Sequence, residues 1–349
     1  REVRIGVVGM GFIGMFHCDA MRQVPEAHLV AVADTVQSPN LKKDEEKFNV
    51  MAYTDPDELL QRPDIDAVTL GTPSGLHMEI AVKAANAKKH VLTEKPIEVT
   101  LEKADRMIQA CRRNGVKLGV ISQRRWDRGM KELKQAVDSG ALGKLILGEA
   151  YVKWYRTQQY YDSGQWRGTW ELDGGGCLMN QGVHTVDCLQ WVMGGVAEVT
   201  AQTALLAHEK IEVEDIAQAL LKFKNGAVGT IIASTAVYPG MDERIEVSGT
   251  KGTMIMNKSD IVFRKIMGEE ESADMGGKTE RGSGAADPQA ITNEGHVAQI
   301  RDFCQAIAEN RDPMITGEDG RKPLEIILAV YQSARTGKPV KLPLKRKKK

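Results

Sequence analysis

The first ~120 residues alternate short apolar runs with segments of helical spacing, and this rhythm constrains the fold more than any other feature. The apolar runs lie at 3–9, 29–33, 67–71, 90–92 and 117–122. The helical segments lie at 12–24, from 55 onward, 76–87 and 100–115. Continuous apolar runs of this length are typical of strands buried on both faces. The alternation therefore predicts a doubly wound, parallel α/β sheet with helices on both faces.

From about residue 123 the rhythm changes, and β-type runs joined by short turns dominate. A strand is expected at 144–154, and further β-type runs lie at 199–207, 216–223, 227–234, 244–248 and 254–256. Helices are expected at 130–139, 177–193, 292–309 and 319–335. Asn225-Gly226 between two runs is typical of a tight hairpin. We therefore predict an α/β domain over 1–122, an α+β domain with a mostly antiparallel sheet over 123–344, and a disordered basic tail over 345–349.

Charge and cysteine content exclude several classes of protein. Lys and Arg total 47 and so do Asp and Glu, so no global charge favours nucleic acid or an anionic membrane. The five cysteines are scattered and lack a C-x-x-C pair, which fits a reducing cytoplasm and argues against disulfides and structural zinc. No apolar run approaches the ~18 residues of a membrane span. No cluster of metal ligands is evident, so we predict no metal.

Gly9-x-Gly11-x-x-Gly14 follows the first expected strand and opens the first expected helix, with Phe12 and Ile13 between the last two glycines. Glycines at this spacing allow a tight turn and a close approach of a pyrophosphate to the helix N-terminus. Asp34 follows the second strand, where a carboxylate accepts hydrogen bonds from ribose hydroxyls and repels a 2′-phosphate. We predict NAD binding in preference to NADP. The alternative is that the nearby Lys42 and Lys43 hold the 2′-phosphate of NADP.

Loops after the other strands should rim the same crevice, because ligands bind beyond the carboxyl ends of parallel strands. The predicted cofactor contacts there are Thr72, Pro73, His77, Glu94, Lys95 and Gln123. His77 has a competing role as a capping or packing residue. Glu94 is expected to orient or neutralise its neighbour rather than to act in catalysis.

Two short motifs carry the expected chemistry. Lys95 ends a buried run and precedes Pro96, so its ammonium should point into the crevice, where it can hold a substrate oxygen. Downstream, Asn180 and His184 share a helical face at i and i+4. Histidine is the natural base near neutral pH. Asp187 either sets the imidazole tautomer or pairs locally. The triplet Gly174-Gly175-Gly176 before them indicates that another group approaches the backbone closely.

Together these motifs resemble the glucose-fructose oxidoreductase and inositol dehydrogenase (Gfo/Idh/MocA) family, over nearly the whole chain. The resemblance implies a Rossmann domain followed by a domain with a large open sheet that often forms oligomers, here a dimer or tetramer. It maps the family lysine and histidine onto Lys95 and His184, with Asn180 where the family often has Asp. Trp166 and Arg167 are expected to reach toward the cofactor. Arg124, Tyr155 and Tyr160 join Asn180 and His184 as expected substrate contacts.

The resulting hypothesis is a cytoplasmic NAD-dependent oxidoreductase acting on a secondary hydroxyl of a sugar, inositol or nucleotide-sugar acid. Lys95, His184 and Asn180 form its predicted catalytic set. Two alternatives stay open at this point. One is a glycosidase of the same fold that uses NAD transiently, and the other is a non-catalytic sensor of dinucleotide or sugar.

Overall fold

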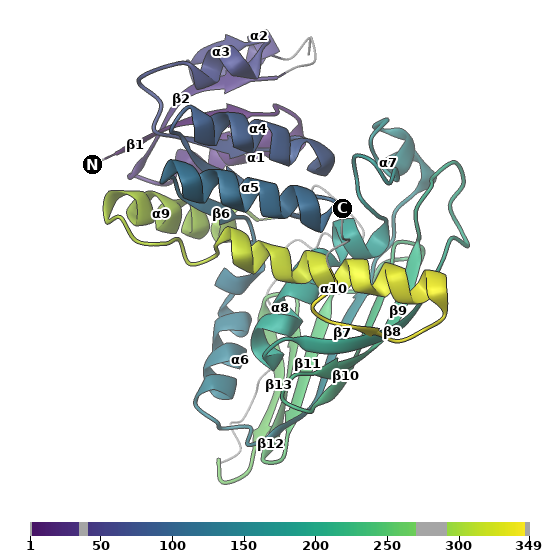
Figure 1. Cartoon of the computed structure of the whole chain (residues 1–349). Helices are drawn as coiled ribbons and strands as arrows, with labels where there is room; N and C mark the ends of the chain where they lie inside the picture. The colour runs from purple at the N-terminus through teal and green to yellow at the C-terminus, as the bar shows by residue number, and fades with distance from the viewer. Residues whose placement is uncertain (1, 35–40, 270–291, 346–349) are drawn as a thin grey trace. The chain divides into compact units, whose positions relative to one another are not determined.

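The computed structural model describes residues 2–34, 41–269 and 292–345, and the chain divides into two compact units. The first unit comprises residues 1–123 and 293–321, and the second comprises residues 124–292 and 322–349. The predicted basic tail lies, from residue 346 onward, outside the described residues. Each unit is built around its own sheet (Figure 1).

The first unit contains the six-stranded parallel sheet that the alternation predicts. Its strand order is β3-β2-β1-β4-β5-β6, the order of a dinucleotide-binding Rossmann fold. The strands are β1 (Val3–Val8), β2 (Ala27–Ala33), β3 (Met51–Tyr53), β4 (Ala67–Leu70), β5 (His90–Thr93) and β6 (Leu118–Val120). The helices are α1 (Phe12–Met21), α2 (Leu41–Phe48), α3 (Pro56–Leu60), α4 (His77–Asn86), α5 (Leu101–Asn114) and α9 (Glu294–Ala308). Helices α1 and α9 pack together, as do α4 and α5.

Local sequence signals set several helix ends as predicted. Asp55 caps α3 by accepting a hydrogen bond from the Asp57 amide at 2.9 Å, with Pro56 in the first turn. Thr100 caps α5 through the Lys103 amide, and Gly115 ends that helix in the left-handed conformation at φ 67°.

Residues 293–321 belong to the first unit. This assignment differs from the prediction of one continuous domain over 123–344. The reason is burial: Ile300 and Phe303 of α9 join the core formed by β1 and α1. Gln299 adds two hydrogen bonds, accepting from the Ser122 amide at 2.9 Å and donating to the Val120 carbonyl at 2.6 Å. A predicted helix can be placed on either domain, and only these long-range contacts assign it to the first.

The second unit contains an eight-stranded, mostly antiparallel sheet in the order β13-β12-β11-β7-β10-β9-β8-β14, with one parallel pair between β7 and β10. The strands are β7 (Leu145–Lys153), β8 (Val196–Ala204), β9 (Ile216–Phe223), β10 (Val228–Ser234), β11 (Arg244–Gly249), β12 (Gly252–Asn257), β13 (Asp260–Ile266) and β14 (Val340–Lys341). Asn225-Gly226 forms the predicted hairpin between β9 and β10, with Gly226 at φ 90° and the Asn225 side chain accepting from the Ala227 amide.

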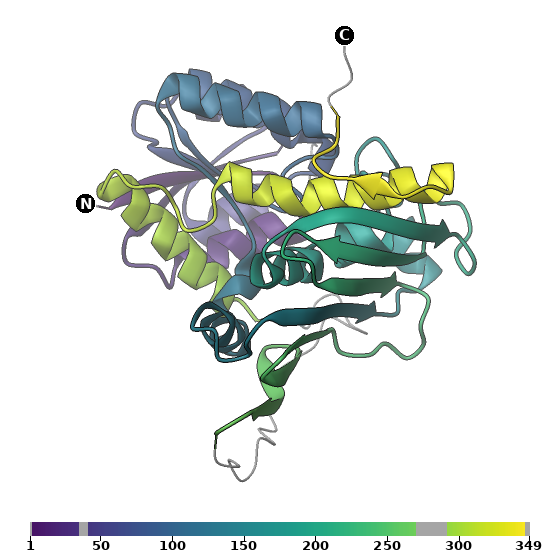
Figure 2. The ribbon, with the colours of Figure 1, turned by 60° about the horizontal axis from the view of Figure 1, so that its bottom comes forward.

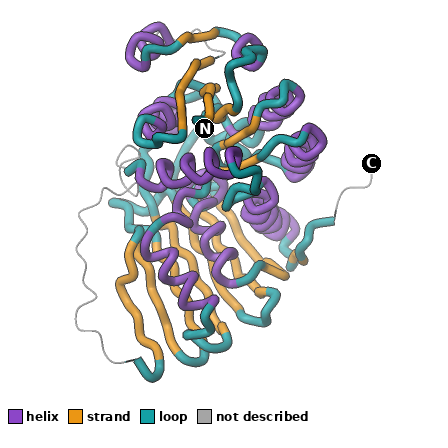
Figure 3. Tube along the Cα trace, turned by 90° about the vertical axis from the view of Figure 1, so that its left-hand side faces the viewer, coloured by secondary structure: helices purple, strands orange, loops and turns teal. Residues whose placement is uncertain are grey.

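Helices lie against one face of this sheet (Figures 2 and 3). They are α6 (Arg128–Asp138), which packs on β12 and β13, and α8 (Val183–Met193), which packs on β7 and β11. A short helix, α7 (Gln158–Asp162), lies in the loop after β7, and α10 (Gly317–Thr336) crosses the boundary between the units at residues 321 and 322. Along β9, buried residues such as Leu221 alternate with exposed ones such as Leu220, so the other face is the accessible one.

Candidate active site

Three glycines bring the loops after β1 and β4 into direct backbone contact. A Cβ on Gly14 would lie 1.8 Å from the Gly9 carbonyl oxygen, and one on Gly71 would lie 3.0 Å from the Gly14 nitrogen. Gly9 itself has φ +92°, a conformation that favours glycine. A Cβ on Gly11, in contrast, would meet nothing within 4 Å. The loop is thus closed on the protein side and open beside Gly11, which is the form of a phosphate cradle at a helix N-terminus.

Asp34 stands beside this glycine loop. Its Oδ2 accepts a hydrogen bond from the Met10 amide at 2.8 Å, which ties the end of β2 to the turn after β1. The carboxylate is therefore held at the place where a Rossmann fold receives the adenosine ribose. The predicted nucleotide-loop residues, including Phe12 and Ile13 at the start of α1, all belong to this unit.

The loop after β5 presents Lys95 from an otherwise buried stretch. Every residue from Val91 to Val99 is buried except Lys95, which is partly accessible. Glu94 Oε2 accepts a hydrogen bond from the Lys95 amide at 3.1 Å. The backbone of the lysine is therefore fixed by its own neighbour, as an orienting role for Glu94 requires.

Glu94 in turn is held by two histidines that the sequence did not single out. Its Oε1 lies 3.0 Å from His17 Nε2 and 3.5 Å from His296 Nε2, and all three side chains are buried. Burial alone would raise the pKa of Glu94, but the two imidazoles outweigh burial and hold that pKa well below its usual range. Glu94 is therefore an ionised, buried anchor, and this corrects its predicted direct contact with the cofactor.

This cluster also corrects the expectation that no metal-ligand set exists. His17, Glu94 and His296 each offer a ligand atom, and these atoms lie within 4.8 Å of one another. The 3.0 Å separation of His17 and Glu94 is that of a hydrogen bond, which accounts for the pair without an ion. The three positions are far apart in the chain, so spacing could not have revealed them.

His77 is a positioning residue rather than a cofactor contact. Its side chain is fully buried, with Nε2 3.1 Å from the Thr72 carbonyl and Nδ1 3.1 Å from the Pro96 carbonyl. Burial lowers its pKa. A side chain without accessible surface cannot contact a dinucleotide, so the packing alternative replaces the predicted contact. His77 links the loop after β4 to the loop after β5.

In the second unit, the predicted close approach to Gly174-Gly175-Gly176 is made by the protein itself. A Cβ on Gly175 would lie 2.1 Å from the Tyr331 hydroxyl, and one on Gly176 would lie 1.8 Å from the Glu214 carbonyl oxygen. The buried Glu214 carboxylate accepts hydrogen bonds from the Gly176 amide, the Leu178 amide and the Tyr331 hydroxyl, at 2.9, 3.0 and 2.9 Å. Burial raises the pKa of Glu214 to about 6 even so. Glu214 therefore anchors the turn that leads to Asn180.

The predicted single helix over 177–193 is interrupted. A π-helical turn, η3 (Cys177–Gln181), precedes α8, and such turns are frequent at functional sites. Every residue from Asp173 to Gln190 is buried except Asn180 and His184, which are partly accessible. The two polar side chains that the sequence identified are thus the two that this segment presents.

Arg124, which is expected near the substrate, and its neighbour Arg125 both pair with carboxylates of the second unit. Arg124 forms ion pairs with Glu243 and, at 3.5 Å, with Asp127. Arg125 binds both oxygens of Asp187 at 2.7 and 2.6 Å in a buried pair. The local-pairing alternative for Asp187 therefore describes the structure. Arg124 is held by carboxylates but stays partly accessible, and its contact with the substrate stays a prediction.

Tyr160 lies at the centre of an aromatic and cationic cluster. Its hydroxyl accepts hydrogen bonds from Arg167 at 2.8 Å and from Gln181 at 3.1 Å. The Arg167 guanidinium lies 4.4 Å from the centre of the Tyr160 ring and 4.5 Å from the centre of the Trp166 ring. Burial raises the pKa of Tyr160, so the phenol stays neutral. Tyr155 packs edge-on against Tyr238.

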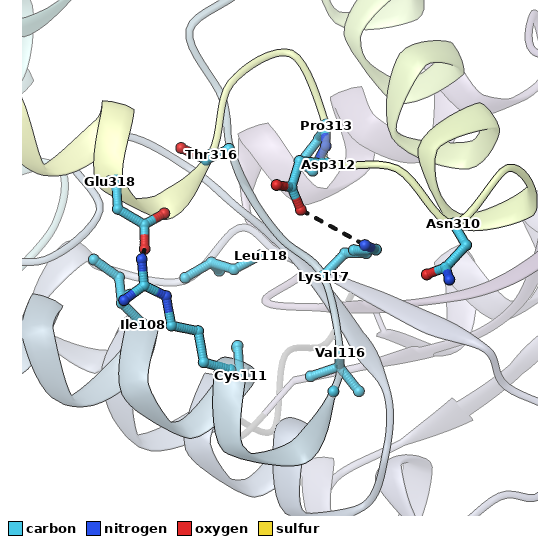
Figure 4. Close-up of a pocket in the computed structure, with 12 residues that line it drawn as sticks. Ile108, Cys111, Val116, Lys117, Leu118, Asn310, Asp312, Pro313, Thr316 and Glu318 are labelled. Atoms are coloured by element: carbon cyan, nitrogen blue, oxygen red, sulfur yellow. Dashed lines mark ion pairs between the residues drawn. The ribbon is translucent and has the colours of Figure 1, made fainter.

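A pocket of about 390 Å³ in the first unit lies apart from the crevice loops (Figure 4). It is bounded by the end of α5, the start of β6 and residues 310–318, and the ion pair of Lys117 with Asp312 and that of Arg112 with Glu318 line it. These elements meet at the amino end of β6, whereas Rossmann ligands bind at carboxyl ends. The pocket is therefore not the dinucleotide site.

In the described part of the chain, no helix combines the length and apolarity that crossing a membrane requires.

Comparison with known proteins agrees with both units. Residues 3–122 match the oxidoreductase family with an NAD-binding Rossmann fold, and residues 130–255 match the GFO/IDH/MocA C-terminal domain. The chain is 31% identical to myo-inositol 2-dehydrogenase of Thermotoga maritima, over 97% of this chain and 98% of that protein. It is 27% identical to the NAD-dependent scyllo-inositol 2-dehydrogenase of Bacillus subtilis, over 99% and 98% of the two chains.

A solved structure with a similar fold is the WlbA dehydrogenase of Bordetella pertussis in complex with NADH and UDP-GlcNAcA. It is 33% identical, with a TM-score of 0.88, over 99% of this chain and 100% of that chain. The glycine cradle, the parallel sheet order and these matches lead to one conclusion. The chain belongs to the GFO/IDH/MocA oxidoreductases, and it is an NAD-binding dehydrogenase that acts on CH–OH groups.

Proposed function

We propose that the protein oxidises a secondary hydroxyl of a sugar, inositol or nucleotide-sugar acid to a ketone, or catalyses the reverse reaction. The relatives named above act on inositols or bind a nucleotide-sugar acid, which supports this substrate class. The Arg167 guanidinium, which lies against the rings of Tyr160 and Trp166, supplies a positive charge that suits an anionic substituent of a sugar or the cofactor phosphates.

The observation that carries the proposal is the pattern of accessibility. Within two long buried stretches, the accessible side chains are an amine in the first, and an amide and an imidazole in the second: Lys95, Asn180 and His184. Burial of every neighbour limits the motion of these three groups and their access to water, as catalytic groups require. Lys95, Asn180 and His184 are the groups that we assign to the reaction.

In this assignment the alcohol loses two hydrogens in different forms. When bound, NAD accepts the carbinol hydride. The imidazole of His184 takes the hydroxyl proton, and the carbon–oxygen single bond becomes the double bond of a ketone. The Lys95 ammonium donates a hydrogen bond to the same oxygen and stabilises the negative charge that develops there. Asn180 binds a neighbouring group of the substrate. Gly9, Gly11, Gly14, Asp34, Thr72 and Pro73 are proposed to hold the dinucleotide, with Gln123, Trp166 and Arg167 near it.

A substrate panel tests the proposal. The purified protein is incubated with NAD or NADP at alkaline pH and with myo-inositol, scyllo-inositol, free hexoses, UDP-GlcNAcA and aryl glycosides. We expect reduced cofactor to accumulate with at least one cyclic polyol, and faster with NAD because Asp34 repels a 2′-phosphate. Glycoside cleavage without net reduction of NAD, or no turnover of any compound, would contradict the proposal.

We further propose that the accessible face of the second sheet binds a second copy of the chain. This open face is defined by Tyr151, Leu220, Lys222, Val228 and Ile232, which the strand register places on one side. Leu220 is 66% and Val228 is 53% exposed, an apolar centre that a monomer would leave in water. Lys222 pairs with Glu198 beside it, so both signs of charge flank the centre. Such a mixed face can pair with itself about a two-fold axis.

Light scattering after gel filtration checks this proposal. The wild type is expected to elute as a dimer or tetramer, and Leu220→Lys is expected to lower its mass to that of a smaller assembly, since a charge at the centre would be buried unpaired. Leu206→Lys is the matched control, because Leu206 is 76% exposed but lies outside the sheet. A monomeric wild type, or an unchanged mass in Leu220→Lys, would refute the assignment of this face.

A further inference from the structure

Asn180 is held in one orientation by a buried carboxylate. Its Nδ2 donates to Asp173 Oδ1 at 2.7 Å. A carboxylate only accepts, so the amide nitrogen must face Asp173 and the amide oxygen must face away from it. Asp173 is itself fixed, because it is 2% exposed and its Oδ2 accepts from the Gly168 amide at 2.9 Å. The buried acid therefore determines which end of the accessible amide is presented.

We infer that Asp173 is a positioning residue that makes Asn180 a hydrogen-bond acceptor, and that the substrate carries a donor next to the carbon that is oxidised. This inference rests on the proposed role of His184 as the base. Asn180 and His184 are four residues apart and are the two partly accessible side chains of the segment from Asp173 to Gln190, so we place the group that binds Asn180 beside the reacting hydroxyl. The donor is a hydroxyl or an amide N–H. The substrate class is thus a vicinal diol or a vicinal amido alcohol, and a carbonyl or ether oxygen at that position is disfavoured.

The two single substitutions disturb the hydrogen bond between residues 173 and 180 in different ways. In Asp173→Asn, the Gly168 amide still needs an acceptor, so the new side chain turns its oxygen to Gly168 and its nitrogen to Asn180. Asn180 must then rotate to accept, which presents its N–H₂ group to the substrate donor. In Asn180→Asp, two carboxylates would meet at the former hydrogen-bond distance, and both cannot stay ionised. We expect each variant to lose about 10- to 100-fold in kcat/KM, the effect of one unmade hydrogen bond in a desolvated site.

The double variant that combines Asp173→Asn with Asn180→Asp should again present a hydrogen-bond acceptor to the substrate. Asn at 173 accepts from Gly168 and donates to the carboxylate at 180, whose second oxygen is again an acceptor. We expect kcat/KM to return to within about fivefold of the wild type. Asp162→Asn is the matched control, since Asp162 is an exposed acid of the same segment, and it should leave kcat/KM unchanged.

Kinetics are measured with myo-inositol and UDP-GlcNAcA, together with deoxy analogues that lack the group beside the oxidised carbon. For the wild type, kcat/KM should be about 10- to 100-fold lower with the deoxy analogue than with the complete substrate. For Asp173→Asn the two values should differ little, because that variant has already lost the interaction. Single variants that keep full activity, or a double variant no better than either one, would overturn the inference.

Thermal unfolding of the four proteins separates this inference from the proposed function. We expect the double variant to melt at a higher temperature than either single variant, and this holds whether or not a panel substrate is turned over. Absence of turnover in the wild type would reject the proposed function and, with it, the substrate class. Additive changes in Tm would reject the Asp173–Asn180 pair itself.

Discussion

His184→Ala is expected to lower kcat by on the order of 10²–10⁴, because the imidazole removes the hydroxyl proton in the transition state. NAD affinity should stay nearly unchanged, since His184 lies in the second unit and the glycine cradle lies in the first. Steady-state kinetics on the best panel substrate, beside NAD titration by tryptophan fluorescence, measure the two effects separately. Lys95→Ala should lower kcat over a similar range and alter NAD affinity modestly, because the first unit carries it.

His28→Ala provides the control for this experiment. His28 is an exposed residue of β2, and its loss should leave both kcat and NAD affinity unchanged. A His184→Ala protein with near wild-type kcat would refute the assigned base. Tyr160 and Tyr161 would be the next candidates for the base. Tyr161 is disfavoured, because it is buried, its hydroxyl is bonded to Thr235 and burial raises its pKa.

Gly14→Ala and Gly11→Ala should separate the two functions of the glycine loop. A methyl group on Gly14 would lie 1.8 Å from the Gly9 carbonyl oxygen, a backbone atom that cannot move without disturbing β1. We expect Gly14→Ala to reduce the free energy of unfolding by about 3 kcal/mol, the upper end of the usual cost of overpacking. A methyl group on Gly11 would meet no protein atom within 4 Å, so the fold should be retained.

The expected loss in Gly11→Ala is in binding instead. If the open side of the loop receives the pyrophosphate, the added methyl group occupies that space and weakens NAD binding by about tenfold or more. Urea unfolding and NAD titration of both variants give the comparison. Equal stability of the two variants would show that the Gly9–Gly14 contact does not govern packing, and undiminished NAD affinity in Gly11→Ala would move the phosphate site elsewhere.

The sequence predicted the fold wherever a strand is buried on both sides. Runs such as 67–71 in the first unit are continuous and apolar, and these strands were found. The strands that were missed, β3, β13 and β14, lie at sheet edges, where one side of the strand has no neighbour and solvent-facing residues weaken the pattern. The π-helical turn η3 was read as regular helix, because hydrophobic spacing does not distinguish a wide turn from an ordinary one.

The candidate site was predictable only in part, for a related reason. Lys95, Asn180 and His184 stand in motifs whose meaning is local. The residues that hold these motifs in place are not near them in the sequence. His17 and Glu94 are 77 residues apart, and Glu214 is 38 residues from Gly176. Arg124 shows the reverse case, since an arginine beside a crevice loop reads as unpaired until its partner Glu243 is seen. Contacts between distant residues depend on the tertiary structure, which a single sequence does not display.

The split first unit has a consequence for how the protein is made. Residues 1–123 leave the ribosome early, but the α9 helix that completes their core follows a further 169 residues, numbered 124–292. At about 5–20 residues per second, translation from residue 124 to residue 321 takes roughly 10–40 s. During that time the surface that later receives Ile300, Phe303 and Cys304 stays uncovered. A fragment ending near residue 123 would keep that apolar surface permanently, so a minimal nucleotide-binding protein must rejoin residues 293–321 to it.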